Sequence, residues 1–179
     1  MCSSDLAAVT LNGTYTTGGG VFTVDNAATL AGAVTIESGS GDVTFGDTID
    51  GAVALVVNST GSAAFSGAVG GTTPLASFTT NAGGSLALDD VTTTGAQSYS
   101  DTTVTLNGTY TTTNANFTVT NNTDLGGSVV LAVGTGDITF SGTIDGSFSL
   151  VAGSTGTTTF SGTVGSSTPV ASILTNAGG

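Results

Sequence analysis

The sequence predicts an all-β fold, a right-handed parallel β-helix (solenoid) of short strands with coils of about 20 residues. Strand-forming Thr, Val and Phe alternate with turn-forming Gly, Asn and Asp. The chain also carries an internal duplication with an offset of 95 residues, and a rhythm of about 20 residues runs inside each copy. Tandem immunoglobulin-like β-sandwiches are the alternative, because such a domain has a similar length. The shorter rhythm and the absence of Trp favour the solenoid.

The composition excludes several classes of partner. Hydrophobic residues make up 38% of the chain and the mean hydropathy is +0.37, so there is enough apolar surface to form a core. The chain has no Lys, Arg or His, and its formal net charge is −12. No side chain can therefore neutralise phosphates, which argues against nucleic acid and against anionic lipid head groups. No apolar run is long enough for a membrane span, so we expect no membrane contact by this segment.

The duplication defines two units. Residues 9–17 (VTLNGTYTT) return unchanged as residues 104–112, and the alignment continues without a gap to residue 179. In it, 44 of 76 aligned positions are identical. We therefore expect a first repeat unit at residues 9–103 and a second, incomplete unit at residues 104–179.

The shorter rhythm places the strands. Apolar triplets recur about every ten residues in the first unit, at residues 9–11, 22–24, 34–36, 43–45, 55–57, 63–65 and 86–88. In a strand, the first and third side chains of a triplet point inward and the second points outward. Gly-Asp, Asn-Gly and Asp-Gly pairs between them suit tight corners. Two or three such strands per coil give about five coils per unit and about nine in the chain.

The first eight residues do not follow this pattern. Residues 1–8 lack the basic and apolar regions of a signal peptide, and residues 2–6 (CSSDL) match the translation of a sequencing adapter. We expect a non-native or disordered leader there, and a chain that is a fragment of a longer protein. The single cysteine, Cys2, can form no internal disulfide.

Four segments carry a resemblance to a known class of repeats. They are residues 41–45 (GDVTF), 48–51 (TIDG), 65–77 (FSGAVGGTTPLAS) and 93–99 (TTGAQSY). With them, residues 9–179 resemble the β-strand repeats of large bacterial secreted adhesins of the filamentous-haemagglutinin and autotransporter type. The resemblance implies a stalk that is extracellular or on the bacterial outer surface and that supports attachment or biofilm.

The same resemblance leaves the partners open. Neighbouring repeats of the chain are the expected partners, together with a host or matrix glycan or protein. A glycan- or protein-binding repeat module is the alternative function, and a non-catalytic part of a larger β-helical enzyme is a second alternative.

Catalysis is not expected. Without His or Lys, the chain can form neither a Ser-His-Asp nor a Ser-Lys constellation, and Cys2 has no base beside it. Two-carboxylate glycosidase chemistry stays formally open, but it occurs on irregular loops of β-helices, which this sequence offers little of. We predict a protein that is not an enzyme, with no catalytic residues and no cofactor.

A few residue types could still bind a ligand. Asp42, Asp47 and Asp50 lie close together and carry the oxygen ligands that calcium prefers. In the second unit Asp42 and Asp50 return as Asp137 and Asp145, but Asp47 aligns with Gly142. We therefore expect turn residues rather than a metal site.

The tyrosines and several asparagines are also possible binding or modification sites. Tyr15 and Tyr110 occupy the same repeat position, which favours packing over sugar stacking, and the same interpretation is applied to Tyr99. Residues 12–14, 107–109 and 58–60 fit the N-glycosylation pattern, to which no role is assigned.

Overall fold

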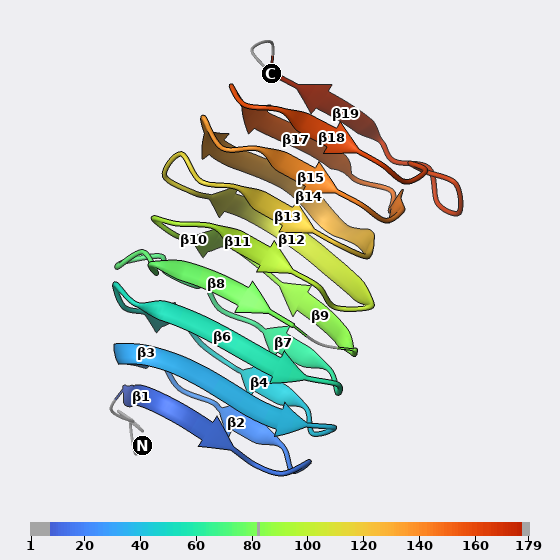
Figure 1. The fold of residues 1–179 in the computed structure, drawn as a ribbon. Coiled ribbons are helices and arrows are strands. Elements are labelled where there is room, and N and C mark those ends of the chain that lie inside the picture. Colours follow the sequence, from blue (N-terminus) through green and yellow to red (C-terminus); the bar gives the residue numbers. More distant parts are fainter. Residues whose placement is uncertain (1–7, 82, 177–179) are drawn as a thin grey trace, which may run out of the picture.

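The computed structural model describes residues 8–81 and 83–176, and it confirms the parallel β-solenoid (Figure 1). Every strand pairing within these residues is parallel, which excludes the antiparallel immunoglobulin-like sandwich. Coils stack about 21 residues apart in about eight turns. The front strands in Figure 1 run from left to right as the stack rises from the N-terminus, so the coil is right-handed. In the described part of the chain there is no helix that could cross a membrane.

The strands form two hydrogen-bonded sheets. The first contains β1 (Val9–Thr16), β3 (Ala28–Gly39), β5 (Ile49–Asp50), β6 (Ala54–Ser59), β8 (Ser77–Thr80), β11 (Gln97–Tyr99), β13 (Phe117–Val119), β15 (Ile138–Phe140) and β18 (Thr158–Phe160). The second contains β2 (Phe22–Val24), β4 (Val43–Phe45), β7 (Ala63–Phe65), β9 (Ser85–Leu88), β10 (Val91–Thr92), β12 (Thr103–Thr111), β14 (Asn122–Gly134), β16 (Ile144–Asp145), β17 (Ser149–Ser154) and β19 (Ser172–Thr175).

The pairing register divides the coil into three faces, because the long strands β1, β3, β12 and β14 each bend around a corner and belong to two faces. We name the faces A, B and C in the order in which the chain first meets them. Face A stacks Val9, Ala28, Ile49, Val69, Val91, Tyr110, Leu131, Ala152 and Thr175. Face B stacks Tyr15, Ile36, Val57, Thr80, Tyr99, Val119, Phe140 and Phe160. Face C stacks Phe22, Val43, Ala63, Leu86, Val104, Thr123, Ile144 and Val164.

The second unit is turned by a third of a coil relative to the first. Val9 is the first rung of face A, whereas its repeat counterpart Val104 is the fifth rung of face C. The 95-residue offset therefore spans four whole coils and two further faces, so that A becomes C, B becomes A, and C becomes B. One coil count from the sequence is corrected: the chain holds about eight coils rather than nine, whereas a unit holds four and two-thirds, close to the five expected. The error arose because some coils carry 23 residues, as between Leu55 and Phe78.

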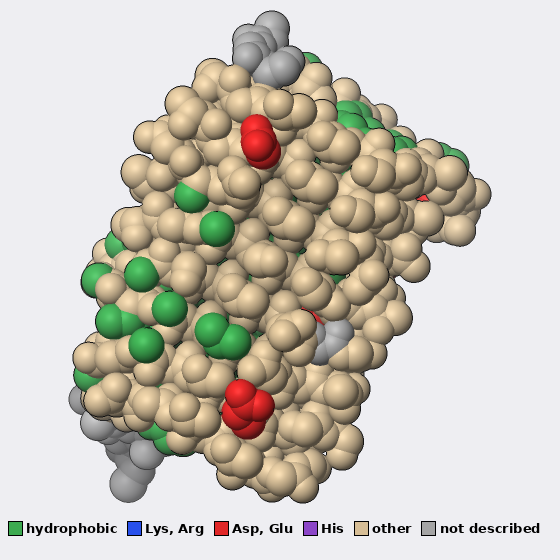
Figure 2. Space-filling view, in the orientation of Figure 1, with side chains coloured by type: hydrophobic (Ala, Val, Ile, Leu, Met, Phe, Trp, Pro, Cys, Tyr) green, Lys and Arg blue, Asp and Glu red, His purple; other side chains and the backbone are tan. Residues whose placement is uncertain are grey.

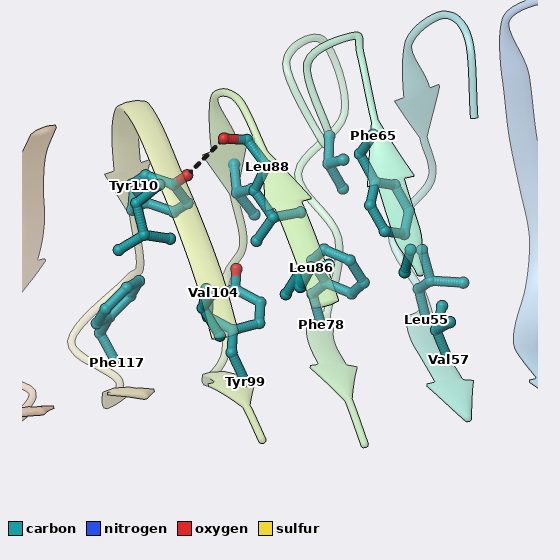
Figure 3. Close-up of a cluster of buried hydrophobic side chains, with 14 of the residues drawn as sticks. Leu55, Val57, Phe65, Phe78, Leu86, Leu88, Tyr99, Val104, Tyr110 and Phe117 are labelled. Atoms are coloured by element: carbon teal, nitrogen blue, oxygen red, sulfur yellow. Dashed lines mark hydrogen bonds between the residues drawn. The ribbon is translucent and has the colours of Figure 1, made fainter. Parts of the chain in front are cut away.

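The predicted triplets all lie in strands. As expected, their inward-pointing side chains form the core. In β4, β6 and β7, for example, buried side chains alternate with partly exposed ones. One row of rings continues along the stack from Tyr15 to Phe160, with each ring centroid 5.1–6.5 Å from the next. Figure 3 shows its middle portion. Burial of large aromatic side chains is among the strongest stabilising contributions available to a coil of this size.

Glycine makes the corner in the long strands possible. Gly13 and its counterpart Gly108 have φ of 87° and 83°, and the register shifts there in both units. A residue with a Cβ is strained at such angles, so the Asn-Gly pair marks where the strand changes face.

No gap separates the two units. β12 contains the beginning of the second unit and pairs on one side with β9 of the first unit and on the other with β14. The units therefore share one continuous core. The predicted leader, residues 1–8, lies outside the described residues apart from Ala8.

Candidate functional site

The outer surface of face B carries one uninterrupted row of small side chains. The row consists of Thr14, Thr35, Val56, Thr79, Ser98, Thr118, Thr139 and Thr159. Seven of these eight side chains carry a hydroxyl group. Neighbouring members of the row lie about 4.8 Å apart along the stack, because adjacent strands in a sheet have that spacing. Figure 2 looks onto this face and shows it mostly free of charged side chains. The row is a repetitive, uncharged hydrogen-bonding surface.

The acidic residues Asp42, Asp47 and Asp50 each accept hydrogen bonds from backbone N–H groups. The Asp42 carboxylate accepts a hydrogen bond from the Ser62 backbone N–H at 2.7 Å, and its counterpart Asp137 accepts one from Thr157 at 2.7 Å. The expectation of a turn role is confirmed, but the turn belongs to the next coil, 20 residues later. These carboxylates therefore tie successive coils together.

Asp50 and Asp145 each hold a longer loop of the next coil. Asp50 accepts hydrogen bonds from the backbone N–H groups of Thr72 and Thr73, at 2.8 and 2.7 Å. Asp145 does the same for Ser167 and Thr168, at 2.7 and 3.0 Å. The loops in question, residues 70–74 and 165–169, contain the two prolines of the chain.

Asp47 is different, since it accepts only from the neighbouring Thr48 backbone N–H, at 2.7 Å. Its lack of a counterpart at Gly142 fits this local role. Within the described residues, no three acidic or Cys side chains are gathered closely enough to hold a metal ion. The turns already use one oxygen of each of the other carboxylates.

The three tyrosines belong to the aromatic row, in agreement with the packing role expected for them. Tyr99 and Tyr110 are fully buried and Tyr15 is partly buried. The Tyr110 hydroxyl donates to the Leu88 carbonyl at 3.0 Å, a bond drawn in Figure 3. Burial raises the pKa of both Tyr99 and Tyr110 well above its ordinary value. The buried rings cannot serve as sugar-stacking platforms.

The Asn residues of the three N-glycosylation patterns contact neighbouring coils of the stack. Asn12 and Asn107 lie at the two strand corners, where Gly32 and Gly127 leave room for their side-chain oxygens. Asn58 is partly buried and donates to the Glu37 carboxylate at 2.9 Å.

The two units differ on one outer surface, and the difference leaves a hollow. In the first unit Glu37 and Asn58 lie side by side on the outside of face B. In the second unit the corresponding pair is Ala132 and Gly153, on face A. The smaller residues leave an open groove of about 360 Å³ whose base includes Val130 and Val151.

A buried polar cluster at the junction between the units was not predicted. Gln97 is fully buried, donates to the Thr111 carbonyl at 2.9 Å, and accepts from the Tyr99 hydroxyl at 3.1 Å. Asp101 is also fully buried, and its carboxylate accepts a hydrogen bond from the Thr80 hydroxyl. The pairing register would have indicated that Gln97 is buried, because it places this residue between Phe78 and Phe117.

Comparison of the chain with protein-family models, with curated proteins and with solved structures found no match.

Proposed function

We propose that this chain is a stalk segment of an exported bacterial surface or secreted adhesin, whose work is to provide length and stiffness. The observation that carries the proposal is the continuity of the core through the junction between the units. β9 of the first unit, β12 and β14 form consecutive rungs, so that two units make one rod rather than two linked domains.

Stiffness follows from this arrangement. Each coil between the first and the last is hydrogen-bonded to both neighbours. The aromatic row crosses the junction through Phe78, Tyr99 and Phe117. A repeat protein of this kind grows by stacking, and each added unit extends the same core. At about 4.8 Å per coil, one unit adds about 22 Å of length. The attachment and biofilm role comes from the adhesin resemblance of the repeats.

The residue composition supports a role without catalysis. The chain has no His, Lys or Arg, so it has neither a side-chain base with a pKa near neutrality nor a cationic group to stabilise an oxyanion. The outer row of face B consists mainly of hydroxyl side chains, which can hydrogen-bond to water.

A second candidate, a glycan- or protein-binding module, is favoured by the groove over Val130, Ala132, Val151 and Gly153. A glycan array and a set of matrix proteins, probed with the purified chain, separate the two. Binding that is lost in Ala132→Glu, which refills the groove as Glu37 does in the first unit, favours the module. Absence of binding favours the stalk.

The stalk proposal is tested by length. Chains with one, two and three additional copies of residues 9–103 are expected to lengthen by about 22 Å per copy in solution scattering, with no bend between copies. A radius of gyration that grows like that of flexibly linked beads would refute the rod.

A further inference from the structure

The junction between the units contains a carboxyl group in an unusual position. Asp101 lies between β11 and β12, and its solvent-exposed fraction is 0%. One carboxylate oxygen, Oδ2, accepts the Thr80 hydroxyl from the preceding coil. The other, Oδ1, is buried and has no hydrogen-bond partner among the residues that the structure describes. A buried carboxylate with half of its acceptors unsatisfied is energetically costly.

No positive charge can offset this cost. The sequence contains no Lys, Arg or His, so a salt bridge to a side chain is impossible anywhere in the molecule. In most proteins a buried carboxylate is paired with a cation or made neutral by a proton. For Asp101 only the proton remains.

The groups around Asp101 add no competing titration near neutral pH. Residues 80–84 of the coil below and residues 120–122 of the coil above contain no titratable side chain. In its own coil the nearby titratable group is Tyr99, whose pKa is raised by burial and, to a smaller extent, by Tyr110 and Asp101. Tyr99 therefore stays neutral throughout the range in which Asp101 changes its charge.

We propose that Asp101 makes the junction a proton-dependent seam, in which the coil around residues 80–103 is held most firmly when the Asp101 carboxyl is protonated and loosens when it is ionised. The proton is taken directly from water and returned to it. The seam is a property of the junction itself and does not depend on the stalk function.

The sign of the effect follows from burial. Burial raises the pKa of Asp101 above its ordinary value, against a smaller lowering by the hydrogen bonds from the Thr80 hydroxyl and from the backbone N–H of Asp101 itself. The folded chain therefore binds this proton more tightly than the unfolded chain does. The stabilisation is present at low pH and is lost as the pH rises from about 3.9, the ordinary value, through the higher folded-state pKa.

Two backbone hydrogen bonds report on the seam. The Ser100 N–H donates to the Thr80 carbonyl at 3.1 Å, and the Thr102 N–H donates to the Gly84 carbonyl at 2.8 Å. Amide hydrogen exchange, corrected for its intrinsic pH dependence, is expected to show their protection falling several-fold as the pH rises from 4 to 7. The Ser141 N–H, which bonds to Val119 at 2.9 Å far from the seam, is the internal control.

The matched variants are Asp101→Asn and Asp25→Asn. Both remove one negative charge, but Asp25 is exposed. Asp101→Asn is expected to abolish the extra pH dependence at Ser100 and Thr102, whereas Asp25→Asn leaves it unchanged. The same pH dependence in all three proteins would overturn the proposal, because it would then arise from the overall charge of the chain.

A measurement on the unaltered chain covers the case in which Asp101→Asn does not fold. The carboxyl carbon of Asp101, followed by nuclear magnetic resonance, is expected to titrate above about 3.9. Titration at or below that value would overturn the proposal.

Discussion

The rings of Phe65 and Phe78 meet edge to face, with centroids 5.1 Å apart, and they carry the aromatic row from face C to face B. Before this contact the row runs along face C, through Phe22 and Phe45. The duplicated positions of the second unit lie on face B because the unit is turned by a third of a coil. Phe78 thus joins two rows that would otherwise end at the junction.

Phe78→Ala is expected to destabilise the chain by about 3–5 kcal/mol, since it removes a fully buried ring and leaves a cavity. Phe148→Ala is the control, because Phe148 is 41% exposed and its loss should cost about 1 kcal/mol or less. Urea unfolding measures both. Equal losses would contradict a special role for the Phe65–Phe78 contact.

Gly13 and Gly108 offer a matched comparison at the two strand corners. Alanine at either position is strained by the positive φ, at a cost of about 1–2 kcal/mol. A Cβ at Gly13 would have no neighbour within 4 Å, but at Gly108 it would lie 2.4 Å from the Asp90 carboxylate. That carboxylate accepts the Thr109 N–H at 2.7 Å and would have to move.

Gly108→Ala is therefore expected to cost more than Gly13→Ala, by about 1–2 kcal/mol for the lost charged hydrogen bond. The double variant Gly108→Ala/Asp90→Ala tests the reason. In that background the additional cost of Gly108→Ala should disappear. If it persists, the clash with Asp90 is not its cause.

Much of the fold could be predicted because apolar and polar residues alternate with the period of a strand. Every triplet from residues 9–11 to 86–88 proved to be a strand, and the Asn-Gly pairs proved to be corners. Much of face A was harder to see. Its strands β5 and β10 contain two residues each, which is too short for alternation to appear.

The interactions between coils could not be predicted, since they depend on the register. The bond from Asp42 to the Ser62 N–H crosses 20 residues, and those of Asp50 cross 22 and 23. If the predicted length of a coil is wrong by even one residue, each of these carboxylates is assigned to the wrong backbone N–H group. Gln97 and Asp101 were missed for another reason: polar side chains are normally exposed, and only the stacking places these two inside.

The loop at residues 165–169 should depend on Asp145, which accepts two of its backbone N–H groups. Asp145→Ala is expected to raise the rate of proteolytic cleavage in this loop several-fold, and to lower stability by about 1–2 kcal/mol. Asp145→Asn keeps a side-chain oxygen in the same place, so it should restore most of the protection. Asp47→Ala, which frees only the adjacent Thr48 N–H, is the control. Equal cleavage of all four proteins would contradict the role of Asp145.

The buried tyrosines predict how the fold responds to alkali. Burial raises the pKa of Tyr99 and Tyr110, so each folded-state value lies above the unfolded value of about 10. The folded chain thus holds these protons more tightly. Stability is expected to be unaffected by them below pH 10 and to fall as the pH rises beyond it. Urea unfolding between pH 8 and 11.5 measures the slope.

Tyr110→Phe separates the ionisation from the packing. The variant loses the hydroxyl bond to the Leu88 carbonyl, which should cost about 1 kcal/mol at neutral pH. The variant also lacks one of the two hydroxyl groups whose proton is bound more tightly in the folded chain than in the unfolded chain. Its free energy of unfolding should therefore decline less steeply above pH 10. Absorbance of tyrosinate provides the second measurement, because Tyr99 and Tyr110 should ionise only together with unfolding. If both ionise near pH 10 while the strands remain intact, the rings are not held in the closed core described above.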